Sequence, residues 1–323
     1  MSATVETMLV LTRSDVEALL EVDALLDALA AAHAELSAGA VSMPPRVAAY
    51  AGDYGLLGAM PAHLPAAGIG CKLVTLFPGN RDRPTHQALI ALFDPKNGSP
   101  VAVMDGTYVT AMRTAAAAAL AARLLARPEA RVLAILGTGV QARAHARTFA
   151  SIRDWDEIRV GGRDWAKAEA LADEIGAVAA TSFEDAARGA DVVAATTHSP
   201  EPIVRLEWIA AGTHVGSVGY AAPGGELDPA LVRAADVLAV ESRESAFAAQ
   251  PAGAPELASV APERAAELGE LVAGRPGRTS DDQITVYKSV GVAVQDLAAA
   301  ALVLAAARKR GAGLEIELEA FRA

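Results

Sequence analysis

Residues 131–146, RVLAILGTGVQARAHA, hold the stretch that decides the fold of this chain. A strand-like apolar run ends at Leu136, a turn containing Gly137 and Gly139 follows, and a helix-forming run comes next. Ala142 completes a G-x-G-x-x-A spacing. In this spacing the first glycine permits a tight turn, the second lets a pyrophosphate approach, and the small third residue lets helix pack on strand. Because strand, turn and helix occur in the required order, we predict a dinucleotide site rather than a chance glycine-rich turn.

The rest of the second half of the chain repeats this order of strand-like and helix-forming runs. From about Thr114, apolar runs alternate with helix-forming runs: EIRVGG (157–162) precedes AKAEALADEIG, and ADVVAATT (190–197) precedes WIAAG. The runs THVGSVG and ADVLAVES follow. Such alternation is typical of the α/β class and predicts a Rossmann doubly wound parallel sheet over residues 114–292.

The first third of the chain has a different pattern. A helix is expected over residues 12–36, where Leu19, Leu26 and Leu29 recur at helical spacing and Thr12 or Ser14 can cap it. Short apolar runs with Gly and Pro turns fill residues 41–104 and predict an open, mostly antiparallel sheet. At the other end, residues 284–311 predict a short strand followed by one long helix.

Composition excludes several classes of protein. The 323 residues carry a net charge of −11 with a sequence pI of about 5.1, which disfavours nucleic acid and anionic membranes as partners. The N-terminus has no basic-then-apolar signal pattern, and charges interrupt the most apolar run. The one cysteine, Cys71, permits neither an intrachain disulfide nor a cysteine metal site, and its apolar context favours a buried, inert thiol. We therefore expect a soluble cytoplasmic protein that takes a small molecule and no metal.

The end of the second parallel strand indicates which nucleotide is bound. An NAD site typically has an acidic residue there, which binds the ribose hydroxyls. This chain has Gly162 at that place and then Arg163, which can pair with a 2′-phosphate. Asp164 follows as an alternative ribose ligand, and Arg163 could also be an ordinary solvated cation. The pattern favours NADP(H), with NAD(H) possible.

The fourth strand ends in Thr196 and Thr197, and ligands bind at the carboxyl ends of parallel strands. We therefore expect both residues near the cofactor. His198 follows them and is expected to be a loop residue near the cofactor rather than a proton shuttle.

Lone cations stand out in the first half. Arg46 and Lys72 lie in apolar surroundings, and Arg113 follows further on. If the second half binds a nicotinamide nucleotide, these three form a set that can bind a substrate carboxylate, and Lys72 can also polarise a carbonyl or imine. The alternative is that each pairs with a buried acid. Few acids lie in these strands, Asp53 being the nearest, which weakens that alternative.

The motifs taken together resemble the ornithine cyclodeaminase/mu-crystallin family. The resemblance runs from about residue 8 to residue 310 and is carried by MPPR, GCKLVTLFPGN, RPTHQALIALFD, VMDGTYVTAMRTAAAAALAARLLAR, ILGTGVQARAHA and ITVYKSVGVAVQDLAA. It implies that residues 1–113 and 293–323 form an α+β domain for substrate binding and homodimerisation. The Rossmann domain, residues 114–292, would lie between them in the sequence.

The resemblance also assigns site residues position by position. Arg46, Lys72 and Arg113 match substrate-carboxylate residues, and Val290 matches a residue that lines the substrate pocket. The remaining positions match cofactor contacts: Thr85, Gly139, Val140, Gln141, Thr196 or Thr197, Ser217, Val218, Gly219 and Ser289.

Two departures from the family pattern bear on the reaction. True cyclodeaminases have a Glu where this chain has Ala59, and an Asp in the neighbourhood of Tyr220, Ala221 and Ala222. Asp228 aligns instead with a structural turn and helix start. The missing acids bring the chain closer to the ketimine reductases of the family than to its ornithine cyclodeaminases.

The sequence therefore predicts an NAD(P)H-dependent imine reductase or amino acid dehydrogenase. Its substrates would be small α-imino or α-amino carboxylates, for example pyrroline-2-carboxylate reduced to proline or piperideine-2-carboxylate reduced to pipecolate. Ornithine or lysine cyclodeamination with tightly bound NAD, alanine dehydrogenation, and NADPH-dependent binding of a small molecule without catalysis are the alternatives.

Overall fold

The computed structural model describes residues 4–221, 224–249 and 252–321. The chain divides into two compact units. Unit 1 comprises residues 1–113 and 292–323, and unit 2 comprises residues 114–291.

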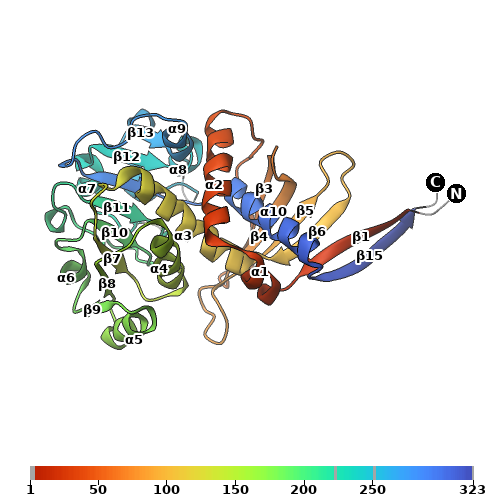
Figure 1. The fold of residues 1–323 in the computed structure, drawn as a ribbon, viewed down its shortest axis with the longest axis horizontal. Coiled ribbons are helices and arrows are strands. Elements are labelled where there is room, and N and C mark those ends of the chain that lie inside the picture. The colour runs from red at the N-terminus through yellow and green to blue at the C-terminus, as the bar shows by residue number, and fades with distance from the viewer. Residues whose placement is uncertain (1–3, 222–223, 250–251, 322–323) are drawn as a thin grey trace. The chain divides into compact units, whose positions relative to one another are not determined.

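Unit 1 is built on a seven-stranded sheet with the strand order β15-β1-β6-β5-β4-β3-β2 (Figure 1). All neighbouring strands are antiparallel except β1 and β6, which are parallel. The strands are β1 (Thr4–Leu11), β2 (Val47–Tyr50), β3 (Leu56–Leu64), β4 (Gly68–Leu76), β5 (His86–Phe93), β6 (Pro100–Asp105) and β15 (Leu314–Phe321). The mostly antiparallel sheet expected from the sequence is thus confirmed.

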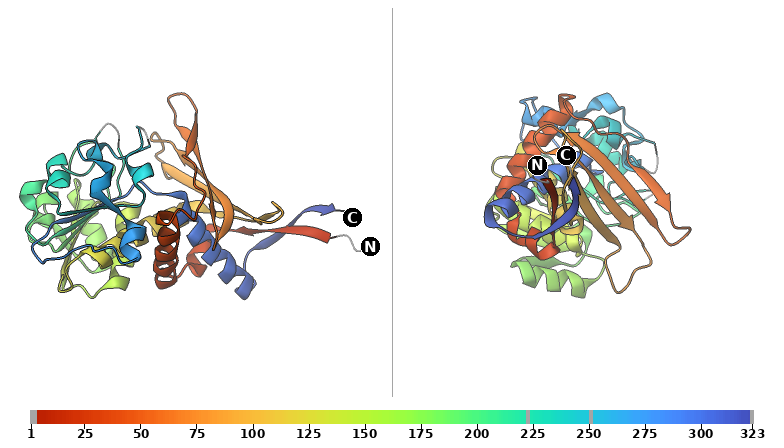
Figure 2. Two further views of the ribbon diagram at one scale, coloured as in Figure 1. Left: turned by 90° about the horizontal axis from the view of Figure 1, so that it is seen from above. Right: turned by 90° about the vertical axis from the view of Figure 1, so that its right-hand side faces the viewer.

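Three helices lie on one side of this sheet: α1 (Arg13–Leu19) and α10 (Ala293–Arg310) contact its strands, and α2 (Val22–Ser37) packs against α10 (Figure 2). Alternate strand residues such as Met60, Leu64 and Ile90 are buried beneath them. The single helix expected over residues 12–36 is wrong in one respect, because the chain leaves the helical conformation at Leu20 and starts again after Glu21. Thr12 caps the first helix, as expected.

Strands β1 and β15 have no counterpart in the sequence-based expectations. They pair along their length and run on as a two-stranded ribbon beyond the other strands of unit 1 (Figure 2). Their pairing joins the first and last described segments of the chain, so a local reading of either end could not find it.

Unit 2 contains an eight-stranded, entirely parallel sheet in the order β13-β12-β14-β11-β10-β7-β8-β9. Its strands are β7 (Val132–Leu136), β8 (Glu157–Gly161), β9 (Val178–Ala180), β10 (Val192–Ala195), β11 (His214–Ser217), β12 (Val237–Val240), β13 (Ala265–Glu267) and β14 (Thr285–Lys288). Strand order reverses between β7 and β10, which creates the switch point where doubly wound sheets bind ligands. The predicted Rossmann fold is confirmed.

Helices alternate with these strands along the chain. They are α3 (Gly106–Leu125), which begins in unit 1, α4 (Val140–Ile152), α5 (Trp165–Ile175), α6 (Phe183–Ala187), α7 (Pro229–Ala234), α8 (Arg243–Ala246) and α9 (Leu268–Val272). WIAAG (residues 208–212), expected to be helical, does not form a helix, and only its first residue, Trp208, belongs to a 3-10 turn, Leu206–Trp208.

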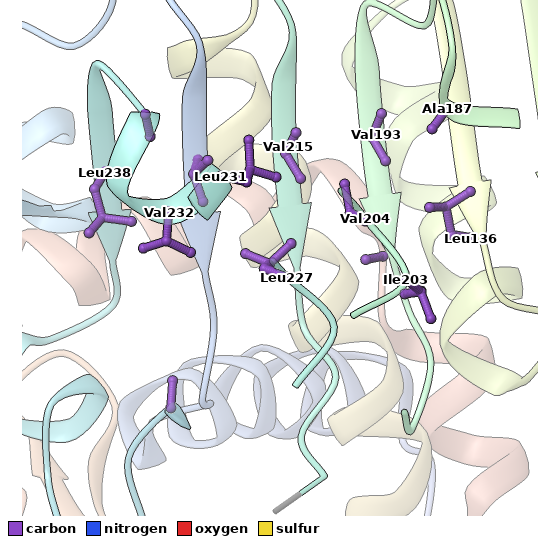
Figure 3. Close-up of a cluster of buried hydrophobic side chains, with 14 of the residues drawn as sticks. Leu136, Ala187, Val193, Ile203, Val204, Val215, Leu227, Leu231, Val232 and Leu238 are labelled. Carbon is purple, nitrogen blue, oxygen red and sulfur yellow. The ribbon is translucent and has the colours of Figure 1, made fainter. Parts of the chain in front are cut away.

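The core on one face of this sheet is drawn in Figure 3. Leu231 and Val232 of α7 pack among Val215 and Leu238 of the strands. Across the described residues, no helix is long and apolar enough to cross a membrane.

Candidate active site

Lys72 lies on the helix-covered face of the unit 1 sheet. It pairs with Met60 of β3 and Ile90 of β5, and side chains at paired positions of an antiparallel sheet point to the same face. Burial follows the same alternation, and the Lys72 side chain is only 2% exposed. Burying an ammonium this completely is costly unless an anion lies beside it.

Asp296 is that anion. It lies in the first turn of α10, is wholly buried, and places Oδ2 2.8 Å from Lys72 Nζ. Its Oδ1 accepts a hydrogen bond from Arg113 Nε at 2.9 Å. The expectation that acids are too few to pair with these cations is therefore wrong for Lys72 and Arg113. The acid comes from the far end of the chain, so a search of the neighbouring strands could not find it.

Arg113 has a second buried partner beside Asp296. Its Nη1 donates to Gln295 Oε1 at 2.6 Å, and Gln295 Nε2 in turn lies 3.1 Å from His33 Nε2 of α2. Four elements of unit 1, namely β4, α3, α10 and α2, thus meet through polar side chains.

Arg46 completes the set from just before β2, where it is exposed. Burial chiefly, and then the charges of Arg113 and Arg46, lower the pKa of Lys72 to about 8, while Asp296 acts in the opposite sense. Lys72 and Arg113 share the single carboxylate of Asp296, which leaves an excess of positive charge. The cluster can therefore accept a further anion such as a carboxylate.

Ala59 does not lie on the same face as Lys72. It pairs with Val47 of β2 and Leu73 of β4, whereas Lys72 pairs with the next residue, Met60. A side chain at position 59 therefore points to the sheet face opposite Lys72. The argument against cyclodeamination that rested on Ala59 is weakened by this register.

The glycine turn of unit 2 follows β7 at the switch point. Gly137 has φ +134°, and a Cβ there would lie 2.5 Å from Thr196 Oγ1, so both conformation and space require glycine. A Cβ on Gly139 would meet nothing within 4 Å. Gly139 also caps α4 without a side-chain hydrogen bond. The turn is therefore uncrowded at Gly139 and no cap side chain occupies the first-turn amides of α4, which fits the pyrophosphate of a nicotinamide nucleotide.

Val140 and Gln141 begin α4 directly after this turn. Val140 is 64% exposed, an unusual position for an apolar side chain at a helix start. Gln141 Oε1 is buried and makes no hydrogen bond within the described part of the chain. Both features are compatible with a ligand that covers this turn.

The end of β8 has little room for an acidic side chain. A Cβ on Gly162 would come within 2.8 Å of Thr138 Cγ2. Asp164, the alternative ribose ligand, accepts a hydrogen bond from Lys167 N and so caps α5. Arg163 is exposed between them and is the charged side chain at this strand end that caps no helix.

Two buried acids engage the strand ends where cofactor contacts were expected. Glu226 accepts hydrogen bonds from the amide and hydroxyl of Thr197, from Ser217 Oγ at 2.9 Å and from Gly219 N at 2.7 Å. Glu241 likewise accepts from Ser289 Oγ and the Val290 amide.

These hydrogen bonds limit which side-chain groups at the strand ends can bind a cofactor. The hydroxyls of Thr197 and Ser289 are engaged by carboxylates, and the Thr196 hydroxyl donates to Leu136 O at 2.9 Å. Sequence reasoning missed both acids, although Glu241 lies within the quoted run ADVLAVES and Glu226 lies a few residues after THVGSVG. Val218 is partly buried beside them and His198 is exposed.

Lys288 is a further buried cation, next to this network of unit 2. It is wholly buried in β14, donates to Ser217 Oγ at 3.0 Å and Gly219 O at 2.6 Å, and lies 3.0 Å from Glu256 Oε1. Together with Glu226 it ties the carboxyl ends of β10, β11 and β14 to one another.

Thr85 and Asp228 complete the predicted positions. Thr85 lies in the β4–β5 connection of unit 1, with Oγ1 3.2 Å from His86 Nδ1. Asp228 caps α7 by accepting from Ala230 N, which agrees with its assignment as a helix start. Tyr220 and Ala221 are described, and Ala222 falls outside the described residues. No group of three metal-binding side chains occurs among the residues described.

Comparison with known proteins gives a consistent result. The model of the ornithine cyclodeaminase/mu-crystallin family matches residues 6–311. Ketimine reductase mu-crystallin of Mus musculus is 42% identical over 273 residues, covering 82% of this chain and 85% of the relative. Two solved structures are similar to nearly the whole chain. Thermococcus litoralis Δ1-pyrroline-2-carboxylate reductase with NADH and L-proline has a TM-score of 0.88 and 32% identity, covering 95% and 99% of the two chains. An archaeal alanine dehydrogenase dimer with bound NAD has a TM-score of 0.89 and 34% identity, covering 97% and 100%.

Proposed function

The chain belongs to the ornithine cyclodeaminase/mu-crystallin family, and from this premise we propose that it reduces small α-imino carboxylates with NAD(P)H. Pyrroline-2-carboxylate and piperideine-2-carboxylate are the model substrates, and the reverse reaction is amino acid dehydrogenation. The chain is thus an oxidoreductase of imine or amino groups that uses a nicotinamide nucleotide. The observation that carries the proposal is the buried cluster of Lys72, Arg113 and Asp296 with its excess of positive charge.

The cluster supplies two functions that imine reduction needs. Arg113 and Arg46 bind the substrate carboxylate, which limits the orientations of the imine carbon and lowers the entropic cost of the reaction. Lys72 holds a proton on Nζ beside the imine nitrogen, which makes the adjacent carbon a better hydride acceptor. In the direction of amino acid oxidation, neutral Lys72 would accept that proton.

The nicotinamide nucleotide supplies or accepts the hydride when bound. The glycine turn at Gly137 and Gly139 and the first-turn amides of α4 would hold its pyrophosphate. Arg163 supports NADP(H) over NAD(H), because the neighbouring Asp164 caps a helix and Gly162 has no side chain.

Arg163 provides a test of nucleotide preference. Replacing it by Ser is expected to weaken NADPH binding about 10- to 100-fold, the worth of a charge-assisted hydrogen bond, and to change NADH binding less than about twofold. Fluorescence titration with both nucleotides measures the two dissociation constants. Arg188, which is exposed and pairs with Glu184 on α6, is the matched control. Equal losses for both nucleotides would contradict a role in 2′-phosphate binding.

A substrate panel tests the proposed reaction itself. Purified protein is expected to oxidise NADPH or NADH in the presence of pyrroline-2-carboxylate or piperideine-2-carboxylate. Imine reduction would be refuted if the protein consumed no cofactor with either of these two substrates or with pyruvate plus amines. Ammonia release from L-ornithine without net cofactor turnover would identify a cyclodeaminase instead. NADH formation from L-alanine would identify an alanine dehydrogenase, and nucleotide binding without turnover of any substrate would identify a binding protein.

We also propose a homodimer formed through the uncovered face of the unit 1 sheet. Exposed apolar side chains follow this face from strand to strand, and paired positions such as Leu73 with Leu89 and Ile69 with Phe93 place them side by side. The set comprises Val47, Leu57, Ile69, Leu73, Leu89, Phe93, Leu314 and Ile316. An apolar sheet face of this extent is typical of protein–protein contacts. A similar solved structure is described as a dimer. A cytoplasmic location stays a prediction.

Substituting Leu73 by Glu tests this interface. A charge at the middle of the apolar face is expected to shift the protein from dimer to monomer at micromolar concentration, because a buried unpaired carboxylate costs several kcal/mol. Light scattering after size exclusion measures the mass. Val178→Glu, at an exposed apolar position of β9 in unit 2, is the control and is expected to leave the mass unchanged. A dimer of unchanged stability in Leu73→Glu would contradict the proposed face.

A further inference from the structure

Asp296 holds the buried cations of unit 1 together. Its Oδ1 and Oδ2 each bind a different cation, Arg113 at 2.9 Å and Lys72 at 2.8 Å, and no part of the residue is exposed. It also lies in the first turn of α10, where the partial positive charge of the helix terminus favours an anion. Negative charge at this position is therefore stabilised by three separate groups.

Gln295 connects Arg113 to His33 by hydrogen bonds, and the donor and acceptor of each bond can be deduced. Its Oε1 accepts from Arg113 Nη1, and its Nε2 lies 3.1 Å from His33 Nε2. A guanidinium can only donate, so the amide oxygen must face Arg113 and the amide nitrogen must face His33. His33 Nε2 is consequently the acceptor. The hydrogen bonds on either side of Gln295 therefore have defined donors and acceptors.

These contacts orient the guanidinium of Arg113. Nε is bound to Asp296 and Nη1 to Gln295, which fixes the plane of the group at two points. Nη2 is the nitrogen that neither residue holds. A planar fork fixed in this way presents its remaining donors in one direction, as recognition of a carboxylate requires.

Asp296 also acts on the charge of Lys72. The groups that face Lys72 are Asp296 from α10, Arg113 from α3 and Arg46 from the segment before β2. Burial and the two arginines lower the pKa of Lys72 to about 8, whereas the charge and hydrogen bond of Asp296 raise it. Asp296 is thus the facing group that favours the protonated form.

We propose that Asp296 is a positioning residue with two effects: it orients Arg113 toward the substrate carboxylate and keeps Lys72 protonated for imine reduction. Gln295 shares only the first effect. The inference rests on the proposed function, because that function assigns the carboxylate to Arg113 and the proton to Lys72.

The Asp296→Asn variant separates these effects from a purely structural role. In the wild type, kcat/KM for imine reduction is expected to fall as pH rises through about 8, since protonated Lys72 is required. Loss of the carboxylate charge disfavours the protonated form, so the midpoint in the variant is expected to move to about pH 7 or lower. NADPH affinity should remain within about twofold. A variant with a melting temperature near that of the wild type and reduced activity, but an unchanged midpoint, would overturn the proposal.

The Gln295→Met variant serves as the charge-neutral comparison. It removes the acceptor for Arg113 Nη1 and leaves the charges around Lys72 in place. We expect KM for the imino acid to rise about 10-fold, with kcat within about twofold and an unchanged pH midpoint. Asp27→Asn, on the exposed side of α2, should match the wild type in all three measurements. If Asp296→Asn does not fold, an unchanged KM in Gln295→Met overturns the orientation of Arg113.

One measurement is independent of turnover. The chain has only five lysines, so NMR of lysine labelled at the ε-carbon can follow the titration of Lys72, assigned with Lys72→Met. A Lys72 titration midpoint that moves downward in Asp296→Asn supports the electrostatic effect even if the substrate panel is negative and the proposed function fails. A midpoint that does not move overturns the electrostatic effect whether or not the enzyme reduces imines.

Discussion

The Lys72→Met variant is expected to lower kcat/KM for imine reduction at least about 1,000-fold while leaving NADPH affinity within about twofold. Positioned proton transfer contributes about 10²- to 10⁴-fold in enzymes, and Lys72 is the cation with a pKa near the working pH. Met has nearly the volume of the lysine stem, so it fills the site without leaving a cavity. Asp296 keeps its ion pair with Arg113 in the variant, which limits the loss of stability.

Steady-state kinetics and nucleotide titration on the same preparation measure the two quantities. Lys96→Met, at an exposed turn of unit 1, is the matched control and should retain wild-type activity. Undiminished turnover in Lys72→Met would remove Lys72 from the proposed mechanism. A wild type without turnover but with tight NADPH binding would favour a binding protein, since the cluster would then have no catalytic consequence.

The fold was largely predictable because its signals are local. The spacing of Gly137, Gly139 and Ala142 between a strand and a helix is contained in sixteen consecutive residues, and the structure gives a steric reason for glycine at position 137. The alternation of apolar runs likewise predicts the parallel sheet of unit 2 and the antiparallel sheet of unit 1. Strands β1 and β15 were not predicted, because their hydrogen bonds join opposite ends of the chain.

The buried acids of both units could not be predicted in the same way. Asp296 pairs with Arg113 across 183 positions of sequence, and nothing in the helical pattern of residues 293–310 marks it as a partner of a β4 lysine. The sheet face of Ala59 could not be predicted for a related reason. A one-residue difference in strand register decides which sheet face a side chain occupies, and register depends on the neighbouring strand.

The hydrogen-bond partners at the strand ends of unit 2 could not be predicted from the local sequence either. Family resemblance assigned Thr197 and Ser289 to the cofactor, and the structure shows their hydroxyls bound to Glu226 and Glu241. Their side chains therefore help to fix the strand ends. Any contact that they make with a nucleotide has to use other atoms or an altered hydrogen-bond arrangement.

The largest loss of stability is expected at Lys288 rather than at the predicted site residues. Lys288→Met leaves Glu256 as a buried carboxylate without its cation, and it removes the donor to Ser217 Oγ and Gly219 O. Breaking a buried ion pair by removing one partner costs about 3–5 kcal/mol. In a unit of this size such a loss lowers the melting temperature by roughly 10 °C.

The double variant Lys288→Met/Glu256→Gln tests this cause directly. Glutamine has the shape of glutamate without its charge, so the uncompensated carboxylate disappears and part of the lost stability should return. We expect the double variant to melt several degrees above Lys288→Met, although Lys288→Met contains one substitution fewer. Thermal unfolding followed by circular dichroism measures all variants, with Lys167→Met on the exposed side of α5 as control. If the double variant instead melted below Lys288→Met, the loss would stem from missing hydrogen bonds at Gly219 rather than from buried charge.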